Sequence, residues 1–281
     1  MTTVLDILDK GTAYLDKRGI EDARRNMQML VAHQLGCTRM DLYLRFDQPI
    51  EDSHLEPLRE ALKRRGDGIP VQHILGTVFF RQHEFKTDAR ALIPRPETEE
   101  LAEWLAKHAK LPEQARILDM GTGSGCLGLS LANDFPGSRV TLADVSPDAL
   151  ELARENAAFT GTSNVDFIQS DLFQNLPADS SYDLIAANLP YVPEGEPVAK
   201  EVRHDPALAL FSGKDGLDLI RRFIPEAARH LAPGGLIALE IGIDQSSEVE
   251  KLLRDASFKD VLTLKDLSGI PRFPVGRRPG P

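Results

Sequence analysis

A run of glycines follows a short apolar segment near the middle of the chain. Residues 116–120 are predicted to form a buried strand, and Asp119–Gly125 (Asp-Met-Gly-Thr-Gly-Ser-Gly) leads from it into a helix beginning near Cys126. Glycines at such a turn let the backbone approach a ligand closely. Asp144 lies 19 residues beyond Gly125, at the end of the next predicted strand. A carboxylate there can accept both hydroxyls of a ribose, so this arrangement predicts binding of a nucleoside-containing cofactor.

The acid at the end of the first strand indicates which cofactor this is. The run departs from the Gly-x-Gly-x-x-Gly pattern of NAD enzymes, and Asp119 stands at the end of the strand that precedes the glycines. A carboxylate at that point can orient a cationic ligand but does not suit a pyrophosphate. S-adenosylmethionine carries a sulfonium and an ammonium group, so it is favoured over NAD. This layout resembles the class I S-adenosylmethionine-dependent methyltransferases.

A second motif, Asn188-Leu189-Pro190-Tyr191, follows the predicted strand 182–187. An amide or aryl amine nitrogen is a poor nucleophile because its lone pair is delocalised. The Asn188 carboxamide oxygen and the Leu189 carbonyl can each accept one of its N–H bonds, which returns electron density to nitrogen and fixes its direction. Tyr191 offers a ring on which a planar group can stack. The motif therefore predicts methyl transfer to a planar nitrogen, although Asn and Pro are also common where a strand simply ends.

The same four residues leave the substrate open. They match the Asn-Pro-Pro-Tyr motif of amino-group methyltransferases, except that Leu189 stands at the second position. Its carbonyl is retained, while the backbone stiffness that proline gives is lost. The variant also resembles the Asn-Leu-Pro-Tyr of ribosomal RNA adenine dimethylases. This motif alone does not distinguish amide substrates from adenine substrates.

Strands and helices alternate from residue 115 onward, which predicts an α/β fold with a mostly parallel sheet and helices on both faces. Ligands in such folds bind at the carboxyl ends of the strands, where the motifs described above all fall. Before this region the sequence predicts a helical segment over 1–75 and a hairpin over 71–80 and 82–92. The predicted strands are 116–120, 139–144, 165–170, 182–187 and 236–241, and the predicted helices are 97–110, one from 126, 147–159, 215–231 and 245–255.

Composition and charge narrow the class of protein. The chain has 281 residues and a net charge of −10. Residues 1–75 hold 11 basic and 12 acidic side chains, so nearly all of the negative charge falls on the remainder. An acidic body disfavours long-range attraction to nucleic acid. Two cysteines cannot form a disulfide scaffold, and the seven histidines show no metal-ligand spacing. We expect a cytoplasmic monomer without metal or membrane span, in which Lys63-Arg64-Arg65 is a solvated helix end and Arg272, Arg277 and Arg278 form a solvated tail.

A third motif carries the most specific resemblance. Residues 92–99, Leu-Ile-Pro-Arg-Pro-Glu-Thr-Glu, form a stiff proline loop leading into a helix, where Arg95 and Glu97 are available to pair. The loop closely resembles the signature of the HemK/PrmC family, the protein-(glutamine-N5) methyltransferases of peptide chain release factors. The resemblance extends over nearly the whole chain, including Ser170–Phe173, Asp215–Asp218 and Pro271–Arg277.

The resemblance implies a role for each matched position. It implies a helical substrate-docking domain over 1–75, a hairpin linker over 76–92 and a catalytic domain with a seven-stranded sheet over 93–281. The partner would be a class I release factor, modified at the glutamine of a Gly-Gly-Gln loop. The cofactor S-adenosylmethionine would contact Asp119, Gly121, Thr122, Gly123, Ser124, Gly125, Asp144, Asp171, Leu172 and Asn188, and the glutamine would contact Asn188, Leu189, Pro190 and Tyr191 beside a wall shaped by Arg95 and Glu97.

Two other functions stay open at this point. One is an adenine-N6 methyltransferase acting on nucleic acid, which the acidic body and the proline loop disfavour. The other is a non-catalytic scaffold that only binds S-adenosylmethionine, which the presence of Asp119, Asp144 and Asn188 disfavours.

Overall fold

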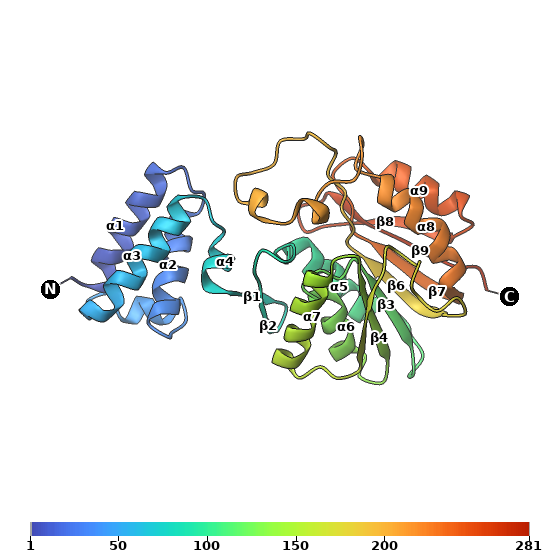
Figure 1. Cartoon of the computed structure of the whole chain (residues 1–281), viewed down its shortest axis with the longest axis horizontal. Coiled ribbons are helices and arrows are strands. Elements are labelled where there is room, and N and C mark those ends of the chain that lie inside the picture. Colours follow the sequence, from blue (N-terminus) through green and yellow to red (C-terminus); the bar gives the residue numbers. More distant parts are fainter. Residues whose placement is uncertain (1, 281) are drawn as a thin grey trace. The chain divides into compact units, whose positions relative to one another are not determined.

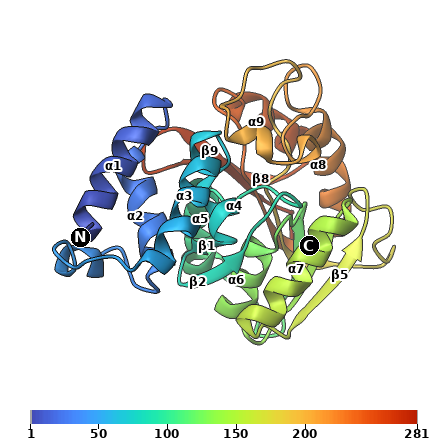
Figure 2. The ribbon, with the colours of Figure 1, turned by 60° about the vertical axis from the view of Figure 1, so that its left-hand side comes forward.

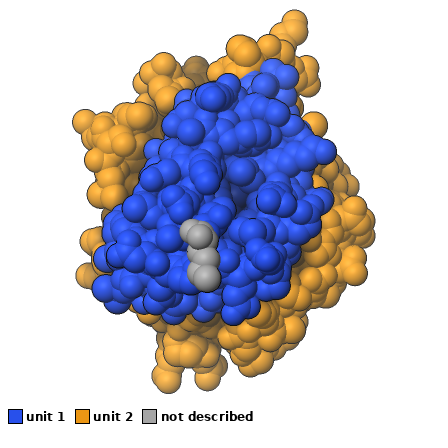
Figure 3. Space-filling view, turned by 90° about the vertical axis from the view of Figure 1, so that its left-hand side faces the viewer, with its two compact units in different colours: residues 1–77, 198–204 blue, residues 78–197, 205–281 orange. Residues whose placement is uncertain are grey.

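The computed structural model of the chain describes residues 2–280. The chain divides into two compact units, which Figure 3 shows in different colours. Unit 1 consists of residues 1–77 and 198–204, and unit 2 consists of residues 78–197 and 205–281. Within the described residues, no helix is both long and apolar enough to cross a membrane.

Unit 2 is built on a seven-stranded sheet, visible in Figure 1. Its strands are β3 (Arg116–Met120), β4 (Arg139–Asp144), β5 (Val165–Gln169), β6 (Tyr182–Ala187), β7 (Leu231–Leu239), β8 (Lys259–Lys265) and β9 (Pro271–Arg277). Their order across the sheet is β5-β4-β3-β6-β7-β9-β8. The first five strands in this order run parallel, and β9 is antiparallel to both of its neighbours. The predicted α/β class with a mostly parallel seven-stranded sheet is confirmed.

Helices cover both faces of this sheet (Figure 1 and Figure 2). Alternation along a buried strand sends successive side chains to opposite faces, and β6 shows this clearly. Leu184 and Ala186 pack with one apolar core, whereas Ile185 and Ala187 pack with the other. The first core is shared with α5 (Pro96–His108), α6 (Cys126–Asp134) and α7 (Pro147–Thr160), and the second with α8 (Asp218–His230) and α9 (Ser246–Asp255).

Unit 1 is helical, as predicted. It contains α1 (Val4–Lys17), α2 (Ala23–Gln34), α3 (Asp52–Gly66) and the short α4 (Val71–Leu75), with a 3-10 turn at Asp41–Leu44. The apolar faces of these helices meet in a core of their own, separate from the two cores of unit 2. This core includes Met27, Leu30 and Val31, whose helical spacing is visible in the sequence.

The expectation of a fully solvated Lys63-Arg64-Arg65 was wrong for Arg65. Its side chain is 2% exposed, although Lys63 and Arg64 are indeed at the surface. The guanidinium donates to Asn26 Oδ1 at 2.7 Å, to the Ile69 carbonyl at 3.2 Å and to the Glu201 carboxylate. Because a buried cation is costly unless it is paired, these three acceptors explain how Arg65 is accommodated inside unit 1.

We expect Arg65→Met to lower the free energy of unfolding by about 2–3 kcal/mol, because three acceptors would lose their charged donor. Urea unfolding of the full chain measures this effect. Arg64→Met is the matched control, since Arg64 is exposed one position earlier on the same helix, and it should shift stability by less than about 0.5 kcal/mol. Equal effects of the two substitutions would contradict the structural role of Arg65.

The predicted hairpin is shorter than expected. Residues 71–75 form α4, not the start of a strand, and only β1 (Thr77–Phe80) and β2 (His83–Lys86) form the two-stranded sheet. Short apolar runs fit either a helix or a strand by pattern alone. Here Pro70 precedes the helix, and its carbonyl accepts from the Ile74 N–H at 3.2 Å.

The expectation of a solvated tail for Arg272, Arg277 and Arg278 was also wrong, because all three are partly buried and residues 271–277 belong to the sheet. They form β9, which lies between β7 and β8. The Arg272 side chain is 14% exposed and lies 3.5 Å from Asp266. Pro271 and Pro274 explain the error, since proline normally argues against an inner strand. The helix predicted over 215–231 begins later, at Asp218, and α8 contains Pro225.

Candidate functional site

A cavity of about 330 Å³ opens where β3, β4 and β6 end. The beginning of α5 and residues 206–209 complete its wall. It lies within unit 2, at the edge of the sheet where ligands of such folds bind. Most of the predicted site residues line it: Arg95, Asp119, Gly121, Thr122, Gly123, Ser124, Asp144, Asp171, Leu172, Asn188, Leu189 and Pro190. Gly125, Tyr191 and Glu97 lie outside the lining.

The glycine turn is held in place by the acid that precedes it. Asp119 Oδ2 accepts from the Thr122 hydroxyl at 2.6 Å and from the Gly128 N–H, in the first turn of α6, at 2.9 Å. Gly121 has a φ of +70°, and a Cβ added there would lie 2.9 Å from Cδ2 of Leu189. This turn therefore requires glycine, and it brings the first motif against the second.

Asp144 joins the same turn from the neighbouring strand. Its Oδ2 accepts from the Gly123 N–H at 2.9 Å, and its Oδ1 accepts from the Ser146 N–H at 2.9 Å. Ser146 in turn caps α7. Burial raises the pKa of Asp144, and burial raises that of Asp119 to about 6. Among residues 2–280, no Lys or Arg forms an ion pair with either carboxylate, so the cavity has a negative end suited to a cationic ligand.

The arginines that line the cavity are all paired with acids. Arg90 pairs with Asp88 and Glu155, Arg95 with Asp205, and Arg222 with Asp171. Arg95 thus binds Asp205, and not Glu97, which the sequence made available for it. Their charges are balanced locally, so they leave the carboxylates of Asp119 and Asp144 uncompensated.

The wall at Asp171 and Leu172 has an unusual backbone. Leu172 has a φ of +50° and is 8% exposed, a conformation that L-residues other than Asn and Asp seldom adopt. Such outliers cluster at ligand sites because the surrounding structure must hold them. Asp171 Oδ2 accepts from the Arg222 guanidinium at 2.8 Å. Arg222 comes from α8, and nothing in the local sequence pattern singled it out.

Asn188 has its amide nitrogen bound and its oxygen free. Its Nδ2 donates to Thr98 Oγ1 at 3.0 Å, and the Thr98 hydroxyl donates to Glu240 Oε2 at 2.6 Å. No residue between 2 and 280 donates a hydrogen bond to Asn188 Oδ1 or to the Leu189 carbonyl. Both residues line the cavity, so two neighbouring acceptors remain for a ligand.

Tyr191 is not part of the cavity lining. Its hydroxyl donates to Glu240 Oε1 at 3.3 Å, and its carbonyl accepts from Gln245 Nε2 at 2.9 Å. Burial, followed by the charge of Glu240, raises the pKa of the Tyr191 hydroxyl, which therefore stays protonated. Glu240, Thr98 and Gln245 were not assigned roles from the sequence, although Glu240 carries the same signal as Asp119, an acid at the end of a buried strand.

The site consists of groups suited to binding and positioning a ligand. No cluster of three metal-ligating side chains occurs in the part of the chain that the structure describes. Cys126 lines the cavity, but burial raises the pKa of its thiol, so it is a poor nucleophile. The glycine turn and two carboxylates suit a cationic nucleoside, and the two acceptors beside it suit an N–H-bearing nitrogen.

Two family models match separate parts of the chain. A family model described as the PrmC N-terminal domain matches residues 6–76, and one described as a methyltransferase domain matches residues 111–262. Among solved structures, a ribosomal protein L11 methylase from Lactobacillus delbrueckii has a TM-score of 0.51 at 22% identity, covering 68% of this chain and 82% of that one. A Thermus thermophilus 16S rRNA methyltransferase in complex with AdoMet and guanosine has a TM-score of 0.53 at 21% identity, covering 72% and 49%. These likenesses establish the fold.

Curated relatives match over nearly their full length. The release factor glutamine methyltransferase of Deinococcus radiodurans is 38% identical over 277 residues, covering 98% of both chains. That of Mycolicibacterium smegmatis is 39% identical over 282 residues, covering 99% of both. With the cavity, the glycine turn and the Asn188 motif in place, this chain belongs to the family of release factor glutamine methyltransferases.

Proposed function

We propose that this enzyme transfers a methyl group from S-adenosylmethionine to the side-chain amide nitrogen of the glutamine in the Gly-Gly-Gln loop of class I peptide chain release factors. The observation that carries the proposal is the pair of unoccupied acceptors, Asn188 Oδ1 and the Leu189 carbonyl. A primary amide presents two N–H bonds in one plane, which this pair is able to accept.

S-adenosylmethionine, when bound, supplies a methyl group activated by its positively charged sulfur. The glycine turn would allow close approach of its methionine and ribose parts, and Asp144 would accept from the ribose hydroxyls. Asp119 and Asp144 favour the positive charge, because neither forms an ion pair with a Lys or Arg among residues 2–280. Asp171 and Leu172 form the wall for the adenine, with Leu172 at a position where many family members have an aromatic residue.

The residues of the second motif act on the glutamine. By accepting both N–H bonds, Asn188 and Leu189 increase electron density on the amide nitrogen and hold its lone pair in one direction. The new bond forms between this nitrogen and the methyl carbon while the carbon–sulfur bond breaks with its electron pair on sulfur. A proton leaves the nitrogen afterwards, so no strong general base is needed. Preorganised acceptors and positioning supply the rate enhancement.

Glutamine is favoured over adenine by the relatives, which are named for glutamine methylation and match both the helical and the catalytic parts. The net charge of −10 also disfavours stable binding to nucleic acid. Unit 1 would dock the release factor away from the Gly-Gly-Gln loop. The cavity is formed by one copy of the chain, which supports a monomer, and a cytoplasmic location follows from a substrate that works in translation.

Methyl transfer from labelled S-adenosylmethionine to a purified class I release factor tests the proposal directly. We expect one methyl group on the glutamine of the Gly-Gly-Gln loop, located by mass spectrometry. A release factor carrying Gln→Ala in that loop is the matched control and should take up no label. Transfer to ribosomal RNA, or label retained by the control, would overturn the assignment.

A further inference from the structure

We propose that Thr98 and Glu240 are positioning residues which fix the orientation of the Asn188 carboxamide, so that Oδ1 and not Nδ2 faces the substrate. The inference deepens the proposed function and rests on it for the identity of the group that is oriented. It assigns a role to two buried residues, 3% and 1% exposed, that lie next to the reacting centre.

The register of the sheet brings the two ends of this chain of hydrogen bonds together. β6 and β7 are parallel neighbours with Ala187 opposite Leu239, so the next residues along each strand, Asn188 and Glu240, are adjacent. The Glu240 N–H donates to the Ala187 carbonyl at 2.9 Å, which continues the ladder past the end of both strands. Thr98 reaches both from the first turn of α5, directly after the proline loop.

Hydrogen-bond polarity explains why this arrangement selects one orientation. An ionised Glu240 only accepts, so the single hydrogen of the Thr98 hydroxyl must point to it. The remaining sites on Thr98 Oγ1 are then acceptors, and the group of Asn188 that faces Thr98 must be a donor. The amide nitrogen is therefore directed to Thr98, and Oδ1 is left for the ligand. Turning the amide over would set two acceptors against each other.

The charge of Glu240 determines the direction in which the Thr98 hydroxyl donates. The groups around Glu240 shift its pKa in opposite directions. Burial raises its pKa to about 7 and the nearby charge of Glu97 raises it, whereas hydrogen bonds from Thr98 and Tyr191 and the charge of Arg272 lower it. The buried Cys126 thiol is a further titratable neighbour. Protonated Glu240 is able to donate to Thr98, whose own hydrogen would then turn toward Asn188 and favour the flipped amide. Acid should therefore reduce turnover.

Two substitutions, Thr98→Val and Thr98→Ser, separate the contribution of the Thr98 hydroxyl to kcat from that of side-chain packing. Valine keeps the shape but cannot bond, and we expect a fall in kcat of about 10- to 100-fold with the Kd for S-adenosylmethionine within about twofold. Serine keeps the hydroxyl, and we expect kcat within about threefold of the parent chain. Initial-rate methylation of the release factor and calorimetric titration of the cofactor measure these quantities, and circular dichroism shows that each variant is folded.

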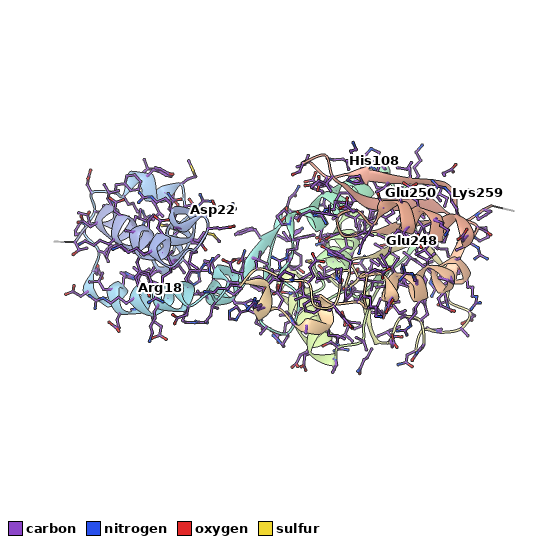
Figure 4. The ribbon with its side chains drawn as sticks, turned by 90° about the horizontal axis from the view of Figure 1, so that it is seen from above. Arg18, Asp22, His108, Glu248, Glu250 and Lys259 are labelled. Atoms are coloured by element: carbon purple, nitrogen blue, oxygen red, sulfur yellow. The ribbon has the colours of Figure 1, made fainter. Side chains whose placement is uncertain are left out.

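Thr263→Val is the control for losing a Thr-to-Glu hydrogen bond as such. The Thr263 hydroxyl donates to Glu250 Oε1 at 2.8 Å. Glu250, labelled in Figure 4, lies on α9, and neither residue lines the cavity. Its kcat should stay within about twofold of the parent chain. An unchanged kcat in Thr98→Val, or equal losses in Thr98→Val and Thr98→Ser, would overturn the inference.

The pH dependence of kcat shows whether Glu240 orients the Asn188 amide or only stabilises the structure around it. At saturating substrates, kcat of the parent chain should fall as pH drops below about 7, and Glu240→Gln should lower kcat about tenfold and remove this limb. A limb that persists unchanged in Glu240→Gln would contradict the role of Glu240. Failure of the parent chain to methylate any release factor would refute the proposed function itself. The decreases in kcat of the Thr98 and Glu240 variants are instead measured against an active parent chain.

Discussion

Asn188→Ala is expected to lower kcat for release factor methylation by about 100- to 1,000-fold, while the Kd for S-adenosylmethionine changes by less than about threefold. The substitution removes one of the two acceptors for the amide N–H bonds and leaves the Leu189 carbonyl alone. The glutamine nitrogen would then have less electron density, and its lone pair would no longer be held in one direction. The glycine turn and Asp144 do not depend on Asn188 for their hydrogen bonds, so cofactor binding should persist.

Single-turnover methylation with labelled cofactor, together with calorimetric titration, measures the two quantities separately. Asn164→Ala is a suitable control, because the Asn164 amide also donates inside the fold, to the carbonyls of Ala132 and Ser138 at 3.1 Å. It lies at the opposite end of the sheet, beside the start of β5. This control should lose thermal stability while its kcat stays within about twofold of the parent. Unchanged turnover in Asn188→Ala would refute the role of Asn188.

The sites predicted from the sequence share one physical property. Asp119, Asp144 and Asn188 each stand where a short, continuous apolar run ends, and such runs are buried parallel strands. Because all parallel strands end at the same edge, finding the runs is enough to bring these residues together. The structure confirms this part, since all three line one cavity.

Glu240 carried the same signal and was still missed. The predicted strand ran over 236–241, which placed Glu240 inside a strand, whereas β7 ends at Leu239. Asp119 also lies one residue before the end of its predicted strand, but a glycine-rich run follows it, whereas Glu240 is followed by the single glycine Gly242. Thr98 was missed for a different reason: its partners are 90 and 142 residues away along the chain, and no local pattern reports such contacts.

Arg65 and β9 show where local patterns give the wrong answer. A basic helix end is normally solvated. Arg65 is buried because the distant residues Asn26 and Glu201, together with the Ile69 carbonyl, accept hydrogen bonds from its guanidinium. β9 contains two prolines, which are unfavourable in a strand, yet its residues 275–277 pair with β7 and its residues 271–277 pair with β8. In both cases long-range contacts outweigh the local preference.

Asp144→Ala is expected to raise the Kd for S-adenosylmethionine by about 100-fold or more, since two charge-assisted hydrogen bonds to the ribose would be lost at about 1.5–3 kcal/mol each. The substitution also frees the Gly123 and Ser146 N–H groups, which Asp144 holds at 2.9 Å. The glycine turn would therefore lose part of its preorganisation, and both effects weaken cofactor binding. At saturating cofactor, kcat should fall much less, because Asn188 and Leu189 remain in place.

Calorimetric titration with S-adenosylmethionine measures the change in Kd. Two further variants show which property of Asp144 causes it. Asp144→Asn keeps one oxygen acceptor and the size of the side chain, so its Kd should rise by only about tenfold. Asp166→Ala removes an acid from the adjacent strand β5, where Asp166 pairs with Arg139 at the surface, and should leave the Kd within about twofold. A Kd in Asp144→Ala within threefold of the parent value would show that the ribose is held elsewhere. Equal increases in Asp144→Ala and Asp166→Ala would instead reveal a general effect of negative charge, because only Asp144 faces the cavity.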